Sequence, residues 1–513
     1  MNKIIGLVVI LAALVLGSYY GTGLITERTL KKNVAMINQS NGGVYIDLQE
    51  YKRGWFTSTA QLKWRLQIPE RVSKDDAGQS VVIPAKDYTV DMPLTVYHGP
   101  VIFADKGVRF GLGYAYTNLN MPAEYMDQFN SNFTAESTKP QVDLSVLVNY
   151  LNRSRLRVEI PKFVLIPKDA GGRFEWMGMT NDVTISSNMK SVDGDLVIDG
   201  MSFTKDNTKA VLEKINSDYE FEQTKEGLYV GEADLSVPSL LVTENQKPVF
   251  ELKEFYANSS SDIDDGLFNT YFKMTLDKVV SNGKTYGPGV LNMSLKNLDA
   301  EVLGRINTQV NKMQQGTPEQ QQQALMALIP ELPKLFSKGA EFRISELNFA
   351  IPEGKLEGTL VISLPKADTD NPFQLIQKTE GDGKIKLPVM LVKNLMKQSI
   401  SQQLKGQQSL PQPQPSNSSQ NDGSTDAAAA TTTQSQQQAQ TGQPQQTTAQ
   451  QPTQLTPAQI DEQAEVQTEK KLADLVQAGV LSMQGDYYVV ELKLANGQLT
   501  VNGQPFNPAV MKI

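Results

Sequence analysis

One histidine is the first candidate for chemistry in this sequence. His98 is the only histidine among 513 residues, and it stands in the run VYHGP at residues 96–100. With a serine and a distant carboxylate it could act as the general base of a hydrolase. Alternatively, Gly99-Pro100 makes a turn and His98 packs or forms hydrogen bonds beside it. We favour the turn, because a lone histidine is far more often structural than catalytic.

Other catalytic and metal-binding patterns are missing from the sequence. The chain has no cysteine, which excludes disulfides, thiolate metal sites and cysteine nucleophiles, and one histidine cannot build a typical zinc site. The acids Asp264-Asp265 lie in the polar run SSSDIDDG and indicate a solvated turn. There is no GxxxxGK[ST] or GxSxG motif, and GLGYAY at 111–116 lacks the third glycine of a dinucleotide loop. We therefore expect no catalytic residue, no cofactor and no metal.

The composition limits the class of protein. Forty per cent of the residues are hydrophobic, which is enough for a substantial core. The net charge is −8 and no segment is strongly basic. Because nucleic-acid binding needs clustered lysine and arginine, we expect no nucleic-acid partner.

The run RGWFTS at residues 53–58 separates two segments with alternating apolar residues. Gly54 lies where the alternation breaks, as in a tight turn or bulge. Trp55 and Phe56 would fasten this corner to its surroundings, and Arg53 could pair with a carbonyl or an acid. We interpret the run as a structural corner; the alternative is a ligand site. The flanking alternation comprises Val44, Ile46 and Leu48, and then Ala60, Leu62, Trp64, Leu66 and Ile68.

The amino-terminal residues predict a membrane anchor. An apolar run at 4–25 precedes the charged residue Glu27 and is long enough for the roughly 20 residues that cross a bilayer. Tyr19 and Tyr20 suit a membrane interface. A cleaved signal peptide, the alternative, would need a shorter apolar core and an Ala-x-Ala-like site. We favour an uncleaved anchor, with residues 27–513 outside the cytoplasm.

The body of the chain predicts a mainly β, α+β fold. After a helix at 27–38, apolar residues alternate with period two in VDLSVLVNY, RLRVEI and later segments at 218–243, 247–258, 268–281 and 340–365. Asp193-Gly194 and Asn496-Gly497 are hairpin signals. Serial half-buried strands of this kind favour a large antiparallel sheet, which we expect to be curved.

A few helices are predicted late in the chain. Asp299 caps the first, and Thr317-Pro318-Glu319 opens the second, with an apolar stripe and with Pro330 and Pro333 as breaks. A third starts at Pro388, and a fourth starts at Thr456-Pro457. We expect the helices near 318–338 and 388–403 to cover part of the apolar sheet face. The predicted stripes are Leu325, Leu328, Ile329 and Leu332 in the second helix, and Leu391, Leu395, Met396 and Ile400 in the third.

The organisation of the chain follows from these patterns. Residues 1–26 form the anchor and residues 27–404 a sheet-rich body. Residues 405–455 are rich in Gln, Ser, Thr and Pro and predict a disordered insertion. Residues 456–513 predict a helix followed by strands that rejoin the body.

Short motifs in a fixed order resemble a known bacterial family. They are YKRGWFTSTAQL, HGP, LIPELPKLFSKGAEFRISELNFAIPEGKLEGTLVISL and the closing ANGQLTVNGQ, and they span nearly the whole chain. Their order is similar to that of the YdgA-like proteins of Gram-negative bacteria, a family with a domain of unknown function; the run at 405–455 departs from it. The resemblance implies an inner-membrane anchor and a body in the periplasm, with no established reaction. It also implies signature positions, structural rather than catalytic, at Arg53, Gly54, Phe56, His98, Gly99 and Pro100.

We therefore predict a membrane-anchored periplasmic envelope protein that is not an enzyme. Its expected partners are the inner membrane, through residues 4–25, and an apolar ligand such as a lipid or another envelope component. A protein-protein scaffold and a hydrolase that uses His98 are the alternatives. The ligand is expected because many strands carry an apolar face and few helices cover them, and a large apolar patch usually marks a binding site. Leu62 and Trp64 would line the resulting groove.

Overall fold

The computed structural model describes residues 2–39, 44–68, 71–74, 80–104, 107–121, 123–169, 171–313, 325–366, 377–409 and 456–506. The predicted insertion at 405–455 therefore lies almost entirely outside the described residues. The chain divides into two compact units. The first comprises Met1–Leu387 with Val489–Pro508, and the second comprises Pro388–Tyr488 with Ala509–Ile513.

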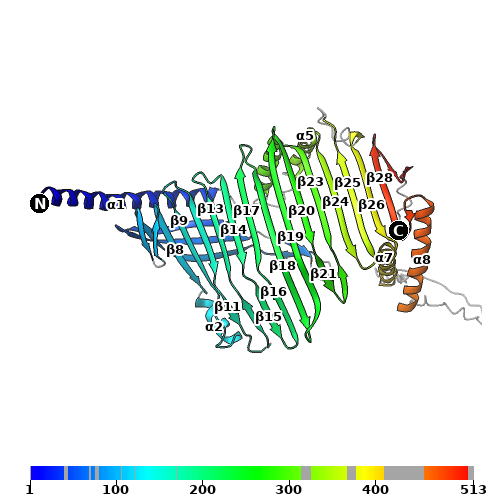
Figure 1. The fold of residues 1–513 in the computed structure, drawn as a ribbon, viewed down its shortest axis with the longest axis horizontal. Coiled ribbons are helices and arrows are strands. Elements are labelled where there is room, and N and C mark those ends of the chain that lie inside the picture. The colour runs from blue at the N-terminus through cyan, green and yellow to red at the C-terminus, as the bar shows by residue number, and fades with distance from the viewer. Residues whose placement is uncertain are drawn as a thin grey trace, which may run out of the picture. The chain divides into compact units, whose positions relative to one another are not determined.

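One large antiparallel sheet dominates the first unit (Figure 1). This confirms the predicted mainly β fold with few helices; the predicted curvature stays a prediction. Most strands pair with their neighbours along the chain, as expected for strands joined by short turns. The principal order is β1 (Val44–Arg53), β2 (Thr57–Ile68), β5 (Lys86–His98), β8 (Gly113–Asn120), β9 (Gln141–Val148), β10 (Ser154–Ile160), β13 (Met179–Ile185), β14 (Ser191–Ile198), β17 (Ile215–Gln223), β18 (Tyr229–Glu244), β19 (Lys247–Asp264), β20 (Leu267–Leu276), β23 (Gly289–Asp299), β24 (Glu341–Ile351), β25 (Gly354–Ser363) and β26 (Glu380–Pro388).

Shorter strands complete the sheet beside the longest ones. Because β18 and β19 are longer than their neighbours, each pairs with an additional strand: β18 with β16 (Thr208–Leu212), and β19 with β21 (Lys278–Ser281). β28 (Tyr487–Ala495) pairs with β26, and Lys384 forms an ion pair of 2.8 Å with Glu491 there. The remaining strands of the sheet are β11 (Phe163–Leu165), β12 (Arg173–Trp176), β15 (Met201–Lys205), β22 (Lys284–Tyr286), β27 (Ser482–Gln484), β29 (Gln498–Val501) and β30 (Gln504–Pro505). Two separate two-stranded sheets are formed by β3 (Arg71–Lys74) with β4 (Ser80–Ile83), and by β6 (Val101–Ala104) with β7 (Gly107–Phe110).

Two-residue turns join several of these strands. Asn496 and Gly497 have φ angles of 52° and 72° and connect β28 to β29, which confirms the predicted hairpin. Asp265 and Gly266, with φ angles of 49° and 75°, connect β19 to β20. The carboxylates of Asp264 and Asp265 are exposed there, so the prediction of a solvated turn is also confirmed.

The predicted hairpin at Asp193-Gly194 is wrong. β14 runs straight through both residues, and the turn that precedes it lies between Ser186 and Ser191. A Cβ atom at Gly194 would lie 2.6 Å from the ring of Tyr219 on the neighbouring strand. The glycine therefore marks the close approach of a side chain rather than a turn, which is the other common meaning of glycine inside a strand.

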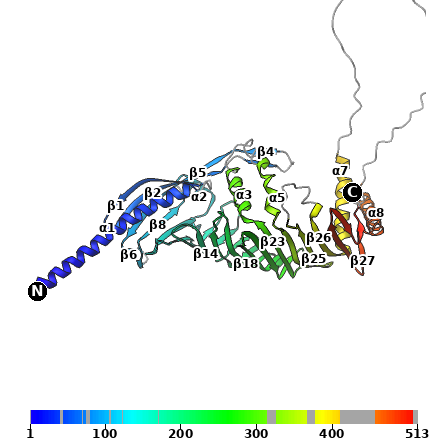
Figure 2. The same ribbon diagram turned by 90° about the horizontal axis from the view of Figure 1, so that it is seen from above.

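The N-terminal helix α1 (Asn2–Gln39) is continuous from the apolar run into the predicted helix at 27–38. It runs beside β1, β5 and β8 and projects beyond the sheet at its N-terminal end (Figure 2). Within the described part of the chain, no helix is long and apolar enough to cross a membrane. The side chains of residues 1–13, which form the first half of the predicted anchor, lie outside that part.

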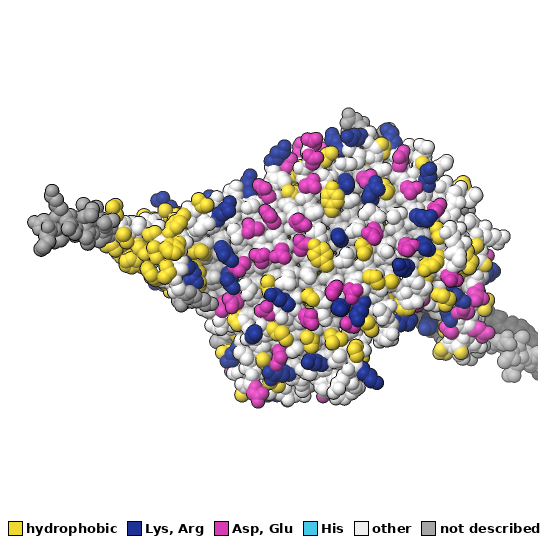
Figure 3. All heavy atoms as spheres, viewed as in Figure 1, with side chains coloured by type: hydrophobic (Ala, Val, Ile, Leu, Met, Phe, Trp, Pro, Cys, Tyr) yellow, Lys and Arg dark blue, Asp and Glu magenta, His cyan; other side chains and the backbone are white. Residues whose placement is uncertain are grey.

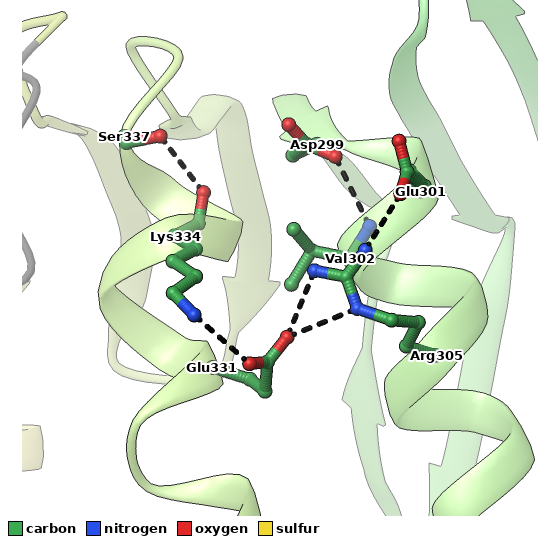
Figure 4. Close-up of polar contacts among 7 residues, drawn as sticks. All are labelled: Asp299, Glu301, Val302, Arg305, Glu331, Lys334 and Ser337. Carbon is green, nitrogen blue, oxygen red and sulfur yellow. Dashed lines mark hydrogen bonds and ion pairs between the residues drawn. The ribbon is translucent and has the colours of Figure 1, made fainter.

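Two further helices pack on the sheet at β23. Asp299 caps α3 (Ala300–Met313), since its carboxylate accepts a hydrogen bond of 3.0 Å from the backbone N–H of Val302, as predicted. In α5 (Glu331–Phe336), Glu331 accepts a hydrogen bond of 2.9 Å from Arg305 of α3 (Figure 4). Beneath these contacts, one core cluster joins the helices to the sheet: Leu298, Val302, Leu335 and Ala340.

The predicted apolar stripe of the second late helix is wrong. Leu325, Ile329 and Leu332 are exposed, whereas Pro333 and Leu335 are buried. The chain turns at Pro330, as predicted, and a new short helix begins, so one helical period does not run through the segment. Its predicted start at Thr317-Pro318-Glu319 lies outside the described residues.

The second unit contains a pair of helices. α7 (Val389–Ser409) packs against α8 (Pro457–Gln477), whose predicted start is confirmed by a capping box between Thr456 and Gln459. Two lysines of α7 hold Glu465 of α8 and lower the pKa of its carboxyl to about 2. Ile400 is buried, but Leu395 of the predicted stripe is 58% exposed, because the packed face of α7 is narrower than predicted.

In the first unit, α2 (Ala123–Asn132) buries Phe129.

Candidate functional site

The run RGWFTS connects β1 to β2 at the end of the sheet. The N–H of Gly54 donates a hydrogen bond of 3.0 Å to the carbonyl of Thr57. A Cβ atom at Gly54 would lie 2.3 Å from that carbonyl oxygen, so the tight corner requires glycine. Trp55 and Phe56 project from the corner and are at least half exposed.

This corner is attached to α1 by both of its aromatic residues and by its arginine. The ring centroids of Phe56 and Tyr19 lie 4.9 Å apart, and those of Trp55 and Tyr20 lie 5.6 Å apart. Arg53 donates hydrogen bonds to the carboxylate of Glu27 at 3.2 Å and to the hydroxyl of Tyr20 at 3.1 Å. Its guanidinium also lies 4.9 Å from the centroid of the Tyr20 ring. The acid that Arg53 pairs with thus belongs to the helix.

His98 lies at the end of β5, directly beneath α1. Its side chain is buried, and its Nε2 lies 3.0 Å from the hydroxyl of Ser58, which is also buried. Its Nδ1 lies 3.3 Å from the backbone carbonyl of Tyr19 in α1. Because a carbonyl can only accept, Nδ1 carries the proton and Nε2 accepts from Ser58. Burial lowers the pKa of His98, and the charge of Arg53 lowers it further, against the opposing effect of the Tyr19 carbonyl.

Glycine residues let the helix approach this histidine closely. A Cβ atom at Gly23 of α1 would lie 2.8 Å from Cε1 of His98. Gly99 has a φ angle of 134°, and a Cβ atom there would lie 2.0 Å from the ring of Tyr19. The carbonyl of Pro100 accepts a hydrogen bond from the hydroxyl of Tyr150. The resemblance-derived positions Arg53, Gly54, Phe56, His98, Gly99 and Pro100 are therefore brought together, at the place where α1 joins the sheet.

The Ser58–His98 arrangement resembles part of a catalytic triad in its distances. However, a backbone carbonyl stands where a triad has a carboxylate, so nothing at that nitrogen would stabilise an imidazolium as an acid does. Both side chains are also covered, since each is 1% exposed. In the described part of the chain, no three acidic or histidine side chains are placed to hold a metal ion. The geometry fits a structural role, in which His98 helps to hold the helix on the sheet.

An apolar cavity of about 490 Å³ lies between α1 and the sheet. Ile25, Leu30 and Val34 line it from the helix, while Leu62 and Trp64 line it from β2. None of the described residues that line it is charged. Pockets for small molecules are typically about 300–1,000 Å³ and mostly apolar, with few polar groups. The size and lining of this cavity therefore suit an apolar ligand.

Two polar atoms in the cavity wall have no hydrogen-bond partner among the described residues. They are the indole nitrogen of Trp64 and the side-chain oxygen of Asn152. One is a donor and the other is an acceptor, and both are buried. A buried polar group without a partner costs free energy, and neither atom is exposed to the cavity, since each has almost no accessible surface.

The sequence indicated part of this wall. Leu62 and Trp64 lie on the predicted apolar face, and Leu144, Val146 and Val148 of the alternating run VDLSVLVNY also line the cavity. The contributions of Ile25, Leu30 and Val34 were not predicted. Their irregular spacing, with threonines between them, gave no clear amphipathic signal.

A comparison of the sequence with known protein families assigns the chain to one of them. The sequence profile of a family described as "Bacterial protein of unknown function (DUF945)" matches residues 1–509. The finer YdgA-like grouping stays a prediction. No curated protein and no solved structure matches the chain. Since the match spans nearly the full length, the chain belongs to the DUF945 family of bacterial proteins of unknown function.

Proposed function

We propose that this protein is anchored in a membrane by α1 and holds an apolar ligand in the cavity between α1 and the sheet. The observation that carries the proposal is the uncharged cavity of about 490 Å³. An acyl chain suits it, because each buried CH₂ group contributes about 0.8 kcal/mol and requires no polar partner.

The proposed anchor and the cavity share one helix. The apolar run at 4–25 continues without a break into the part of α1 that lines the cavity. We infer that the anchor lies in the inner membrane and the body in the periplasm, in line with the YdgA-like resemblance. A lipid that left the bilayer along the helix would meet the cavity directly, which supports a lipid over a water-soluble ligand.

We also propose that the protein is not an enzyme. The specific observation in favour of a hydrolase is the 3.0 Å contact between Ser58 and His98. Ser58→Ala separates the two proposals: the variant should keep its ligand, whereas a hydrolase would lose turnover of a fluorogenic ester. Wild-type protein that hydrolyses such an ester, with the activity lost in Ser58→Ala, would replace our proposal. A scaffold that contacts only proteins would carry no lipid.

The ligand is tested on the full-length chain, extracted in mild detergent and assayed for bound lipid by mass spectrometry. Ala115→Phe fills the cavity from β8, and we expect it to remove most of the bound lipid. Leu66→Asp is the matched control, because Leu66 shares the strand of Leu62 and Trp64 but is exposed and does not line the cavity. If Ala115→Phe does not fold, Leu156→Trp fills the cavity from β10. Wild-type protein without lipid, or equal lipid in filled and control variants, would contradict the proposal.

A further inference from the structure

The β6–β7 hairpin exposes its apolar side chains, whereas a hairpin surrounded by water normally exposes its polar ones. Phe103 and Val108 pair across it, and Phe110 lies two residues beyond Val108 on the same face. All are exposed, and Phe103 is 70% exposed. On the opposite face, Ile102 is buried and the guanidinium of Arg109 lies 3.9 Å from the centroid of the Tyr114 ring. The hairpin thus turns its charge inward and its apolar side chains outward.

Other exposed apolar side chains lie at the same end of the sheet. Tyr19 of α1 connects them, because its hydroxyl donates to the carbonyl of Val101 in β6 and its ring packs on Phe56. Figure 3 shows hydrophobic side chains gathered beside the N-terminal helix, whereas charged side chains spread over the rest of that face. We call the following residues the apolar rim: Trp55, Phe56, Phe103, Val108, Phe110 and Leu151, each at least half exposed.

The position of the apolar rim along α1 determines how much of the proposed anchor precedes the sheet. Among the side chains of α1 that the structure describes, Tyr19 is the first to contact the sheet, and residues 4–18 of the apolar run precede it. As a helix these residues rise about 22 Å, whereas the hydrocarbon core of a bilayer is about 30 Å thick. If the whole apolar run is to lie within a membrane, the bilayer must reach the end of the sheet, where the rim is.

We propose that the apolar rim is a second membrane contact, which seats the end of the sheet on the lipid surface around α1. The inference rests on the proposed function, because it requires α1 as an anchor. Lipid is the occupant that fits, since Leu14, Val15 and Leu16, which precede Tyr19 in the proposed anchor, are exposed as well. Trp55, Tyr19 and Tyr20 are also residue types that favour the membrane interface. The contact lies at headgroup depth, because a two-stranded hairpin has open edges that hydrocarbon would leave without hydrogen bonds.

The rim is tested with an environment-sensitive fluorophore on single cysteines, which the cysteine-free chain allows without background. The full-length protein is reconstituted into phosphatidylcholine–phosphatidylglycerol vesicles, with or without lipids that carry a quencher near the headgroup. Phe103→Cys reports the rim, and Gly17→Cys, where a side chain meets nothing within 4 Å, reports the anchor. Thr285→Cys on β22 is the control, an exposed position on the β21–β22 hairpin of the large sheet. Val108→Cys replaces Phe103→Cys if that variant does not fold.

We expect the quencher lipids to remove emission at positions 17 and 103 and to leave it unchanged at position 285. Loss at position 17 alone would overturn the rim and leave the anchor standing. Emission at position 103 that is shifted to the blue but resists the quencher would mean that protein covers the rim, which also overturns the lipid contact. No loss at either position 17 or 103 would overturn the anchor and the rim together.

Discussion

Helices cover one sheet at two places in the first unit, and the two covers are built differently. At β23, α3 and α5 bury Leu298, Val302, Leu335 and Ala340 in one cluster. Between α1 and β1 to β10, the side chains leave a cavity of about 490 Å³. The first cover shows that helices can pack tightly on this sheet. The cavity under α1 is therefore not a necessary result of the architecture, and we propose that a ligand fills it.

The polar contacts of the two covers differ as well. α3 and α5 are joined at the surface by the ion pair of Arg305 with Glu331, and Arg305 also contacts Glu301 of its own helix (Figure 4). α1 is held by the buried, neutral His98, whose Nδ1 donates to the carbonyl of Tyr19, and by the ion pair of Arg53 with Glu27. The two regions should consequently respond to acid at different pH values.

The largest difference is expected from truncating one leucine in each region. Leu298→Ala in the packed cluster should lower the free energy of unfolding by about 2–5 kcal/mol, because surrounding atoms cannot fill the space. Leu156→Ala in the cavity wall should cost less, because Leu156 already borders empty space and is only half-buried. Denaturant unfolding of the full chain in detergent measures both. Equal costs would mean that the cavity is not a distinct region.

One added methyl group should disturb the packing of α1 on the sheet and lower the stability of the fold. Gly23→Ala places a carbon 2.8 Å from the His98 ring, and such overpacking typically costs about 1–3 kcal/mol. Gly21→Ala is the matched control on the same helix, since nothing lies within 4 Å of its Cβ position; alanine there should stabilise the helix slightly. Thermal unfolding followed by circular dichroism compares them. A harmless Gly23→Ala would show that the helix does not press on His98.

Acid should loosen α1 before it affects α3 and α5. The pKa of His98 is lowered in the folded chain. Its contribution to stability is therefore complete above its ordinary pKa of about 6.5 and declines as the pH falls through that value toward the lowered one. We expect wild-type protein to lose stability between pH 7 and pH 5, and His98→Gln to show a weaker dependence. Parallel pH profiles for the two proteins would exclude His98 as the source.

The smallest effect is expected at Glu331. Hydrogen bonds from Arg305 and Lys334 lower the pKa of its carboxyl, so it stabilises the fold above its ordinary pKa. This contribution is lost as the pH falls from about 4.5 through the lowered pKa. Glu331→Gln should cost less than about 1 kcal/mol at pH 7, and the difference from wild type should vanish in stronger acid. A difference that persists at pH 2 would point to packing rather than charge.

The sequence predicted the strands well, because alternating apolar residues and Asn-Gly or Asp-Gly turns are local signals. It failed at Gly194, where the glycine makes room for Tyr219 on another strand. It also failed at Leu325 and Ile329: Pro330 divides the helix as predicted, but the predicted apolar stripe was continued across that break. Both errors arise where a local pattern depends on a distant or interrupting residue.

The candidate site was predictable only in part, for the same reason. The residues of RGWFTS and HGP stood out, but their meeting place on α1 depends on contacts between residues 26 to 82 positions apart. The approach of Gly23 to His98 could not be derived from either motif alone. The cavity is a property of the space between elements, and no single stretch of sequence encodes it.

The most direct test of the account uses Trp64, whose side chain lines the cavity. The chain has three tryptophans, so Trp55→Phe with Trp176→Phe leaves Trp64 as the only one, and Trp55→Phe with Trp64→Phe leaves Trp176. Delipidated full-length protein in detergent is titrated with a brominated fatty acid, which quenches tryptophan at contact. We predict saturable loss of emission from Trp64 at one equivalent of ligand and none from Trp176, which does not line the cavity. Equal quenching of both residues, or no quenching of Trp64, would contradict the claim that the cavity holds an apolar ligand.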